Sequence, residues 1–135
     1  MPEEWGKGER AYRALFEAAN DAMLVIHQGR VVECNLRALE LFAAGSETLA
    51  GKSLAELSPE LQRDGRNSLA RSGDLMLRVR AGESMLIEWR CRRLEGTLFD
   101  GELSLSAVET GGEPLLHCLV RDIRERGLSH APSRR

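Results

Sequence analysis

Three cysteines are the first residues whose chemistry could define a site. Cys34, Cys91 and Cys118 are an odd number of thiols, and the sequence has no Cys-x-x-Cys pair. A disulfide framework or a closed zinc site is therefore not expected. Each cysteine stands among Val, Ile, Leu or Trp in a run typical of a strand, where a buried thiol packs as a small hydrophobe. We interpret all three as structural residues.

The three histidines lack the spacing of a metal site or a catalytic pair. No two of His27, His117 and His130 have the i, i+4 separation that places two ligands on one helix face. His117 and Cys118 are neighbours in a predicted strand, so their side chains point to opposite faces. No third residue is placed to orient a base. The sequence predicts no catalytic residue and no metal ligand.

Trp89 is the strongest candidate for a binding residue. It alternates with Ile87 and Cys91 on one face of a predicted strand, in the middle of the predicted sheet. The simplest interpretation is core filling, because aromatic side chains dominate cores. The alternative is the wall of a pocket between sheet and helices, where a planar ligand could stack. The residues predicted to line this pocket are Asn35, Leu39, Met76, Trp89, Leu103 and Leu105.

Composition and charge restrict the classes of partner. The chain has 135 residues, 42% hydrophobic and 30% charged, which predicts one soluble globular domain. No apolar run approaches the roughly 20 residues of a membrane-spanning helix, and the N-terminus lacks the basic and apolar regions of a signal peptide. The net charge of −2 disfavours nucleic acid as a partner. We expect a cytoplasmic domain.

The elements that must position these residues begin with a helix and a hairpin. Glu9–Asn20 has an amphipathic pattern whose apolar face predicts a dimer contact or a lid on the outer face of the sheet. Ala22–His27 and Arg30–Cys34 are strand-like runs around the two-residue turn Gln28-Gly29, which predicts a β-hairpin.

Short helices follow the hairpin. Asn35 is placed to cap a helix over Leu36–Ala44, for which we expect an inward face of Leu36, Leu39, Phe42 and Ala43. Ser53–Glu56 is a capping box, and Ser58 precedes a proline as a cap would. Ser68–Ala81 fits a helix, although part of it also alternates like a strand.

The last third of the chain is predicted to form three strands. Met85–Arg93, Leu98–Val108 and Leu115–Ile123 alternate or are apolar, and Gly-containing turns separate them. Two strands, several helices and three strands predict an α+β domain with helices on one face of an antiparallel sheet.

Four stretches of the sequence carry a family resemblance. They are Arg30–Asn35, Gly51–Leu54 with its Gly-Lys, Ser58–Arg66 with its Ser-Pro and Asp-Gly-Arg, and Glu88–Arg93, through Gly96-Thr97, to Val120–Arg126. Together they resemble the PAS domain, a sensory module of bacterial signalling proteins, over about residues 9–127. The first is similar to its second strand with the helix-capping Asn, the second to the Gly-Lys before a short helix, the third to the Ser-Pro-x-x-Gln-Pro-Asp-Gly-Arg run of one PAS branch, and the fourth to the C-terminal half and exit motif of that branch.

The resemblance implies a PAS-like fold, with a five-stranded antiparallel sheet, short helices on one face and an N-terminal flanking helix. Residues 9–127 would form the sensor domain, between an N-terminal extension (1–8) and a flexible tail (128–135). The expected function is a non-catalytic sensory and homodimerisation module. It would detect a small apolar or planar ligand, or a redox state, for a covalently linked histidine kinase or diguanylate cyclase. The alternative is a flavin-binding redox sensor or a small flavin-dependent enzyme.

The exit motif and two departures from the family pattern refine this expectation. Signal relay is expected at Asp122, Arg124 and Arg126, with Asp122 capping a helix after the last strand or pairing with a nearby arginine. Arg63 replaces the usual Pro, and Cys91 stands where His is common, so a haem or metal role at position 91 is not expected. The Asn-Cys-Arg-Phe motif of the light-sensing subclass is absent. No bound cofactor is therefore the first expectation, and flavin is the second.

Overall fold

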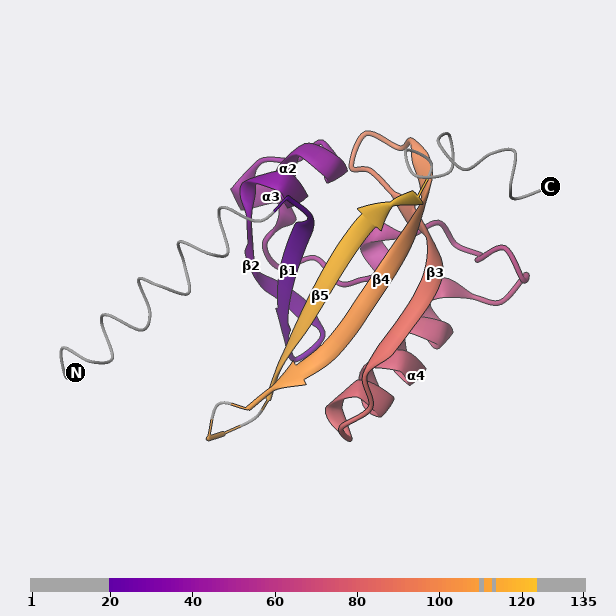
Figure 1. The fold of residues 1–135 in the computed structure, drawn as a ribbon. Coiled ribbons are helices and arrows are strands. Elements are labelled where there is room, and N and C mark those ends of the chain that lie inside the picture. Colours follow the sequence, from indigo (N-terminus) through magenta and orange to yellow (C-terminus); the bar gives the residue numbers. More distant parts are fainter. Residues whose placement is uncertain (1–19, 110, 113, 124–135) are drawn as a thin grey trace, which may run out of the picture.

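Five strands form one antiparallel sheet in the order β2-β1-β5-β4-β3. The computed structural model describes residues 20–109, 111–112 and 114–123. In Figure 1 the sheet faces the viewer, and α4 lies behind β3 and β4. The predicted flanking helix 9–20, apart from Asn20, the extension 1–8 and the tail 128–135 lie outside the described residues. The elements are β1 Ala22–His27, β2 Arg30–Cys34, α2 Leu36–Phe42, α3 Ser46–Leu49, η1 Ala55–Leu57, α4 Ser68–Arg80, β3 Met85–Arg92, β4 Leu98–Val108 and β5 Leu115–Asp122.

The predicted hairpin is confirmed. Gln28 and Gly29 both have positive φ angles, 53° and 81°. This backbone conformation matches the right-handed twist of two strands joined by a two-residue turn. The strand pairing places His27 directly opposite Arg30 at the end of the hairpin.

Of the four side chains predicted to face inward on α2, Phe42 and Leu39 pack in or against the core, whereas the prediction was wrong for the other two. Asn35 caps the helix as predicted, and its side chain accepts a hydrogen bond from the Ala38 amide. Leu36 is 58% exposed and Ala43 is also exposed, whereas Ala38 and Phe42 are fully buried. The reason is that the Asn35 side chain also forms hydrogen bonds with the Met23 amide and the Asp21 carbonyl at the start of β1. These bonds fix the orientation in which the helix begins, with Ala38 and Phe42 facing inward.

Two helix caps were predicted in the segment between α3 and α4, of which the first is confirmed and the second was wrong. The Ser53 amide donates to Glu56 Oε1 over 2.8 Å, and the Glu56 amide donates to Ser53 Oγ over 3.2 Å, which is the predicted capping box. Ser58 begins no helix, since the chain from Pro59 to Asn67 is irregular, and it instead follows the last residue of η1, where its amide donates to the Ala55 carbonyl. Its buried hydroxyl instead accepts a hydrogen bond from the indole of Trp89, 31 residues away.

The three C-terminal strands and the ambiguous helix agree with the sequence. Ser68–Arg80 is helical, with Asn67 as its cap. The predicted alternation of β3 and β4 is confirmed, and β5 is the central strand. β3, however, lies at an edge of the sheet rather than in its middle. The Gln62 side chain covers this edge, because its amide group accepts from the Arg90 N–H and donates to the Arg90 carbonyl.

Candidate functional site

The residues predicted to line a pocket are divided between the core and its margin. Trp89, Leu103 and Leu105 are at most 2% exposed and share the inner face of β3 and β4. Asn35 is fully buried as a cap. Leu39 and Met76 are partly buried against this core. Of the six residues, Met76 lines the apolar cavity described next. The other five do not line it and are packed in or against the core.

An apolar groove of about 440 Å³ lies alongside α4, and we call it the α4 groove. Its wall includes Leu54 before η1, Leu116 of β5 and three apolar side chains of α4, namely Leu69, Met76 and Leu77. Ser53, Ser72, Gln28 and Arg80 supply polar groups at the same groove. An apolar cavity with a few polar groups has the general character of a small-molecule site.

The surface of α4 at the groove is unusual for a soluble helix. Leu69 is 70% exposed and Leu77 is 65% exposed. Gly73 lies between them in the sequence, and a Cβ added there would meet no heavy atom within 4 Å. Together with Met76 and Arg80, these residues recur at helical spacing and form a second stripe beside the buried Leu75 and Val79 stripe. This spacing was the sequence signal that could have revealed the groove.

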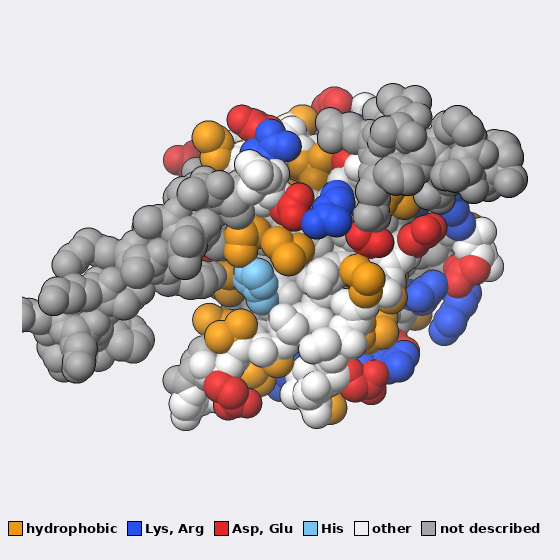
Figure 2. Space-filling view, viewed as in Figure 1, with side chains coloured by type: hydrophobic (Ala, Val, Ile, Leu, Met, Phe, Trp, Pro, Cys, Tyr) orange, Lys and Arg blue, Asp and Glu red, His pale blue; other side chains and the backbone are white. Residues whose placement is uncertain are grey.

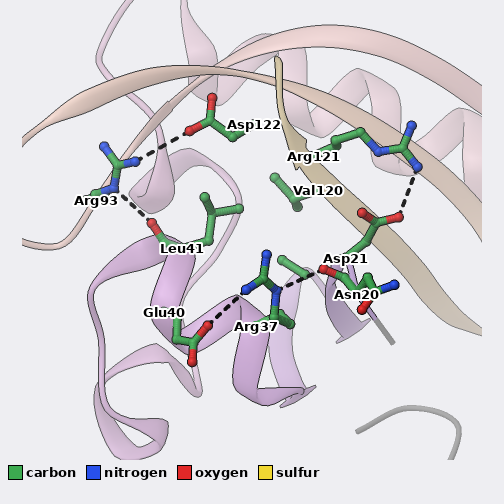
Figure 3. Close-up of a pocket in the computed structure, with 10 residues that line it drawn as sticks. Asn20, Asp21, Arg37, Glu40, Leu41, Arg93, Val120, Arg121 and Asp122 are labelled. Atoms are coloured by element: carbon green, nitrogen blue, oxygen red, sulfur yellow. Dashed lines mark hydrogen bonds and ion pairs between the residues drawn. The ribbon is translucent and has the colours of Figure 1, made fainter. Parts of the chain in front are cut away.

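A polar pocket of about 240 Å³ lies where the described chain begins and ends. In Figure 3, Asp122 at the end of β5 points toward Arg93, which follows β3. Arg93 Nη2 lies 3.7 Å from Asp122 Oδ2, and both side chains are less than 20% exposed. Arg93 also donates to the Leu41 carbonyl over 2.9 Å and lies above the ring of Phe99. Sequence reasoning sought a partner of Asp122 at Arg124 or Arg126, which lie outside the described residues, and missed Arg93.

The same pocket joins the start of β1 to other elements. Arg121 Nη2 lies 2.9 Å from Asp21 Oδ2, across the β5–β1 boundary. Arg37 of α2 donates to the Asn20 carbonyl over 2.8 Å and pairs with Glu40 (Figure 3). The residues that precede β1 and those that end β5 are therefore linked by ion pairs and hydrogen bonds.

Burial favours the neutral forms of two buried thiols and of the half-buried His117 imidazole. Burial raises the pKa of the Cys118 thiol to about 12, and burial also raises the pKa of the Cys91 thiol. Burial lowers the pKa of His117, whose Nε2 has no hydrogen-bond partner among the described residues. A protonated thiol is a weak nucleophile, so Cys91 and Cys118 have the character of core residues at neutral pH.

Residues 20–109, 111–112 and 114–123 contain no group of three His, Cys, Asp or Glu side chains arranged to hold a metal ion. No helix among them is long and apolar enough to cross a membrane. On the face shown in Figure 2, acidic and basic side chains are interspersed, with no large area of one charge.

The profile of the PAS fold matches residues 10–123 of this sequence. The chain belongs to the PAS family. A protein of Azorhizobium caulinodans, described as uncharacterized, is 30% identical over 123 residues. The match covers 87% of this chain but only 16% of that relative's length.

Solved PAS structures share this architecture. A domain of the sensory box sensor histidine kinase/response regulator from Geobacter sulfurreducens superposes with a TM-score of 0.71 and 21% identity, covering 85% of this chain and 94% of that domain. The Rhodobacter sphaeroides LOV protein gives a TM-score of 0.71 and 21% identity, covering 95% of this chain and 73% of that protein. These likenesses, at 21% identity, show a shared fold, and domains of the PAS family are generally non-catalytic.

Proposed function

We propose that this PAS domain is the sensory and homodimerisation module of a bacterial, cytoplasmic signal-transduction protein. Residues 9–127 would form the sensor, flanked by 1–8 and 128–135. It binds a small apolar molecule and passes the resulting conformational change to a covalently linked histidine kinase or diguanylate cyclase. The observation that carries this proposal is the α4 groove, which combines apolar walls with exposed leucines.

Ligand binding in the groove has a clear physical driving force. Leu69 and Leu77 expose most of their surface to water. Complete burial of one leucine side chain contributes roughly 1.5–3 kcal/mol. A ligand that covers part of both side chains therefore gains apolar contact without disturbing the packed layer of Trp89, Leu103 and Leu105. The serines and Gln28 offer hydrogen bonds to a single polar group on such a ligand.

Titration with 1-octanol tests the groove, since this probe has an apolar chain and one hydroxyl group. We expect saturable binding by isothermal titration calorimetry. Leu69→Glu places a charge in the groove and is expected to weaken binding at least tenfold. Leu86→Glu is the matched control, because Leu86 is similarly exposed, at 67%, but lies on β3 and does not line the groove. Equal affinity in both variants would place the probe elsewhere.

Signal output is proposed to leave through the end of β5. Asp122 is held by Arg93 at the last residue of the strand, and Arg124 and Arg126 follow it in the exit motif. Asp122→Asn preserves the shape of the side chain but removes its charge. In the full-length parent protein we expect this change to alter effector activity. Glu88→Gln, at an exposed carboxylate of β3, is the control and should leave activity unchanged.

A flavin-binding redox sensor or flavin-dependent enzyme is the alternative. It is supported by the planar indole of Trp89 on the inner face of the sheet, where a planar ligand could stack if the core opened. The visible absorption spectrum of the purified protein separates the two proposals. A flavin band would favour the alternative, and a colourless protein that binds 1-octanol would favour the apolar-ligand sensor.

A further inference from the structure

The hydroxyl of Ser58 connects the wall of the α4 groove to the inner face of β3. Ser58 Oγ donates a hydrogen bond to the Leu54 carbonyl over 2.5 Å and accepts one from Trp89 Nε1 over 2.8 Å. All three residues are at most 4% exposed. Leu54 lines the groove, whereas Trp89 lies in the core beside it. Ser58 thus makes a polar contact between a groove residue and the sheet.

The geometry of this contact makes its two hydrogen bonds interdependent. A serine hydroxyl has one proton, and here that proton is directed to the Leu54 carbonyl. The remaining lone pairs are therefore oriented for the indole N–H. If Leu54 moves, the buried hydroxyl must rotate to find another acceptor, because an unpaired polar group in the core is costly. Rotation removes or weakens the hydrogen bond to Trp89.

The position of Trp89 in the sheet connects this contact to the end of β5. Trp89 of β3 is directly opposite Gly101 of β4, and Gly101 is directly opposite Asp122 of β5. β4 is tightly enclosed at this point, since a Cβ added to Gly101 would lie 3.3 Å from Cys91 Sγ and 3.4 Å from the Arg121 carbonyl oxygen. A movement of β3 at Trp89 is therefore transmitted through β4 at Gly101 to β5 at Asp122.

We propose that Ser58 is a positioning residue that couples occupancy of the α4 groove to the orientation of Trp89, and through it to Asp122. The proposal rests on the proposed function, because it assumes that a small apolar molecule enters the groove. A ligand that displaces Leu54 changes the acceptor of the Ser58 hydroxyl, and the indole responds. Removal of the Ser58 hydroxyl should therefore leave ligand binding intact but abolish the response of Trp89 to the ligand.

Trp89 itself supplies the measurement. The chain has two tryptophans, so Trp5→Phe leaves Trp89 as the only one. In this background we expect 1-octanol to shift the Trp89 emission with the midpoint found by calorimetry. Ser58→Ala should bind 1-octanol within about threefold of the parent affinity but lose the emission shift. Ser58→Thr, which keeps the hydroxyl, should restore it.

Ser68→Ala is the matched control. Ser68 is also buried, at 2% exposure, and its hydroxyl also accepts a hydrogen bond from a side-chain N–H, that of Gln62, over 2.8 Å, but it does not line the groove. This variant should retain the emission shift. A shift that is lost equally in Ser58→Ala and Ser68→Ala would overturn a specific role for Ser58.

A measurement on the unmodified chain covers the case in which Ser58→Ala does not fold. The indole N–H resonance of Trp89 should move on saturation with 1-octanol, and its exchange with solvent should become faster. An unchanged resonance with calorimetric binding intact would overturn the coupling and leave the sensor proposal standing. Absence of calorimetric binding would overturn the sensor site and, with it, the coupling.

Discussion

Asn35 makes more hydrogen bonds than a helix cap requires. Its Oδ1 accepts from the amides of Ala38 and Met23, and its Nδ2 donates to the Asp21 carbonyl, each over 3.0 Å. Asn35→Ala removes the cap and leaves buried backbone groups unpaired, so we expect a loss of about 2–4 kcal/mol in the free energy of unfolding. Asn67→Ala is the control, because the more exposed Asn67 side chain caps α4 through the Ala70 amide. It should cost about 1 kcal/mol by urea denaturation. Equal losses would show that the bonds to β1 contribute nothing.

His117 gives the domain a pH-dependent stability. Val25 of β1 and Ser106 of β4 lie directly opposite it, and burial lowers its pKa below the ordinary value of 6.5. The unfolded chain therefore binds a proton more readily than the folded chain. The contribution of His117 is fully present above pH 6.5 and decreases as the pH falls through and below that value. His117→Gln should flatten the decrease in unfolding free energy between about pH 7.5 and 5. If the variant shows the same decrease, other groups cause it.

Local sequence patterns predicted residue roles only when the partner was also local. Asn35 was recognised as a cap because strand and helix meet at it, yet its bonds to Asp21 and Met23 depend on the return of the hairpin. The Ser-Pro pattern suggested a helix cap at Ser58, but the distant indole of Trp89 binds its hydroxyl. Such partners depend on tertiary contacts that no local pattern contains.

At the scale of elements, periodicity predicted which segments form but not how they are ordered. Alternation identified β3 and β4, and their residues face as expected. The strand order, with β3 at the edge, depends on pairings between distant segments. α4 was ambiguous because Leu75, Leu77 and Val79 alternate as in a strand. The structure explains this, since Leu77 belongs to the exposed groove stripe and the other two belong to the core stripe.

The groove stripe of α4 also predicts a stabilising substitution. Gly73 lies inside the helix, has ordinary helical φ and has open space where a Cβ would be. Gly73→Ala should raise the unfolding free energy by about 0.5–1 kcal/mol, since glycine is a poor helix former. Gly96→Ala also meets open space but forces a side chain onto a φ of 112°, and it should destabilise the fold. A loss of stability in Gly73→Ala by urea denaturation would contradict the account of α4.

At the scale of the whole molecule, the question is whether the sheet opens as one unit. Cys91 lies on the edge strand β3 and Cys118 on the central strand β5, and both are fully buried. β3 is held by more than its pairing with β4, because Gln62 binds the Arg90 backbone and Arg92 donates to the Glu56 carbonyl over 3.2 Å. These contacts favour a cooperative transition in which β3 does not separate first.

Alkylation of the thiols by iodoacetamide measures this cooperativity. The thiolate is the reacting species, and burial keeps Cys91 and Cys118 protonated and covered in the folded chain. Both should therefore react only through global unfolding, at equal rates that rise together with urea, whereas the partly exposed Cys34 should react first. Mass spectrometry of the digested protein follows each site separately. Faster modification of Cys91 than of Cys118 at low urea would show that β3 detaches before the rest of the sheet. In that case the contact between Ser58 and Trp89 would be lost in a locally open state rather than held throughout the folded domain.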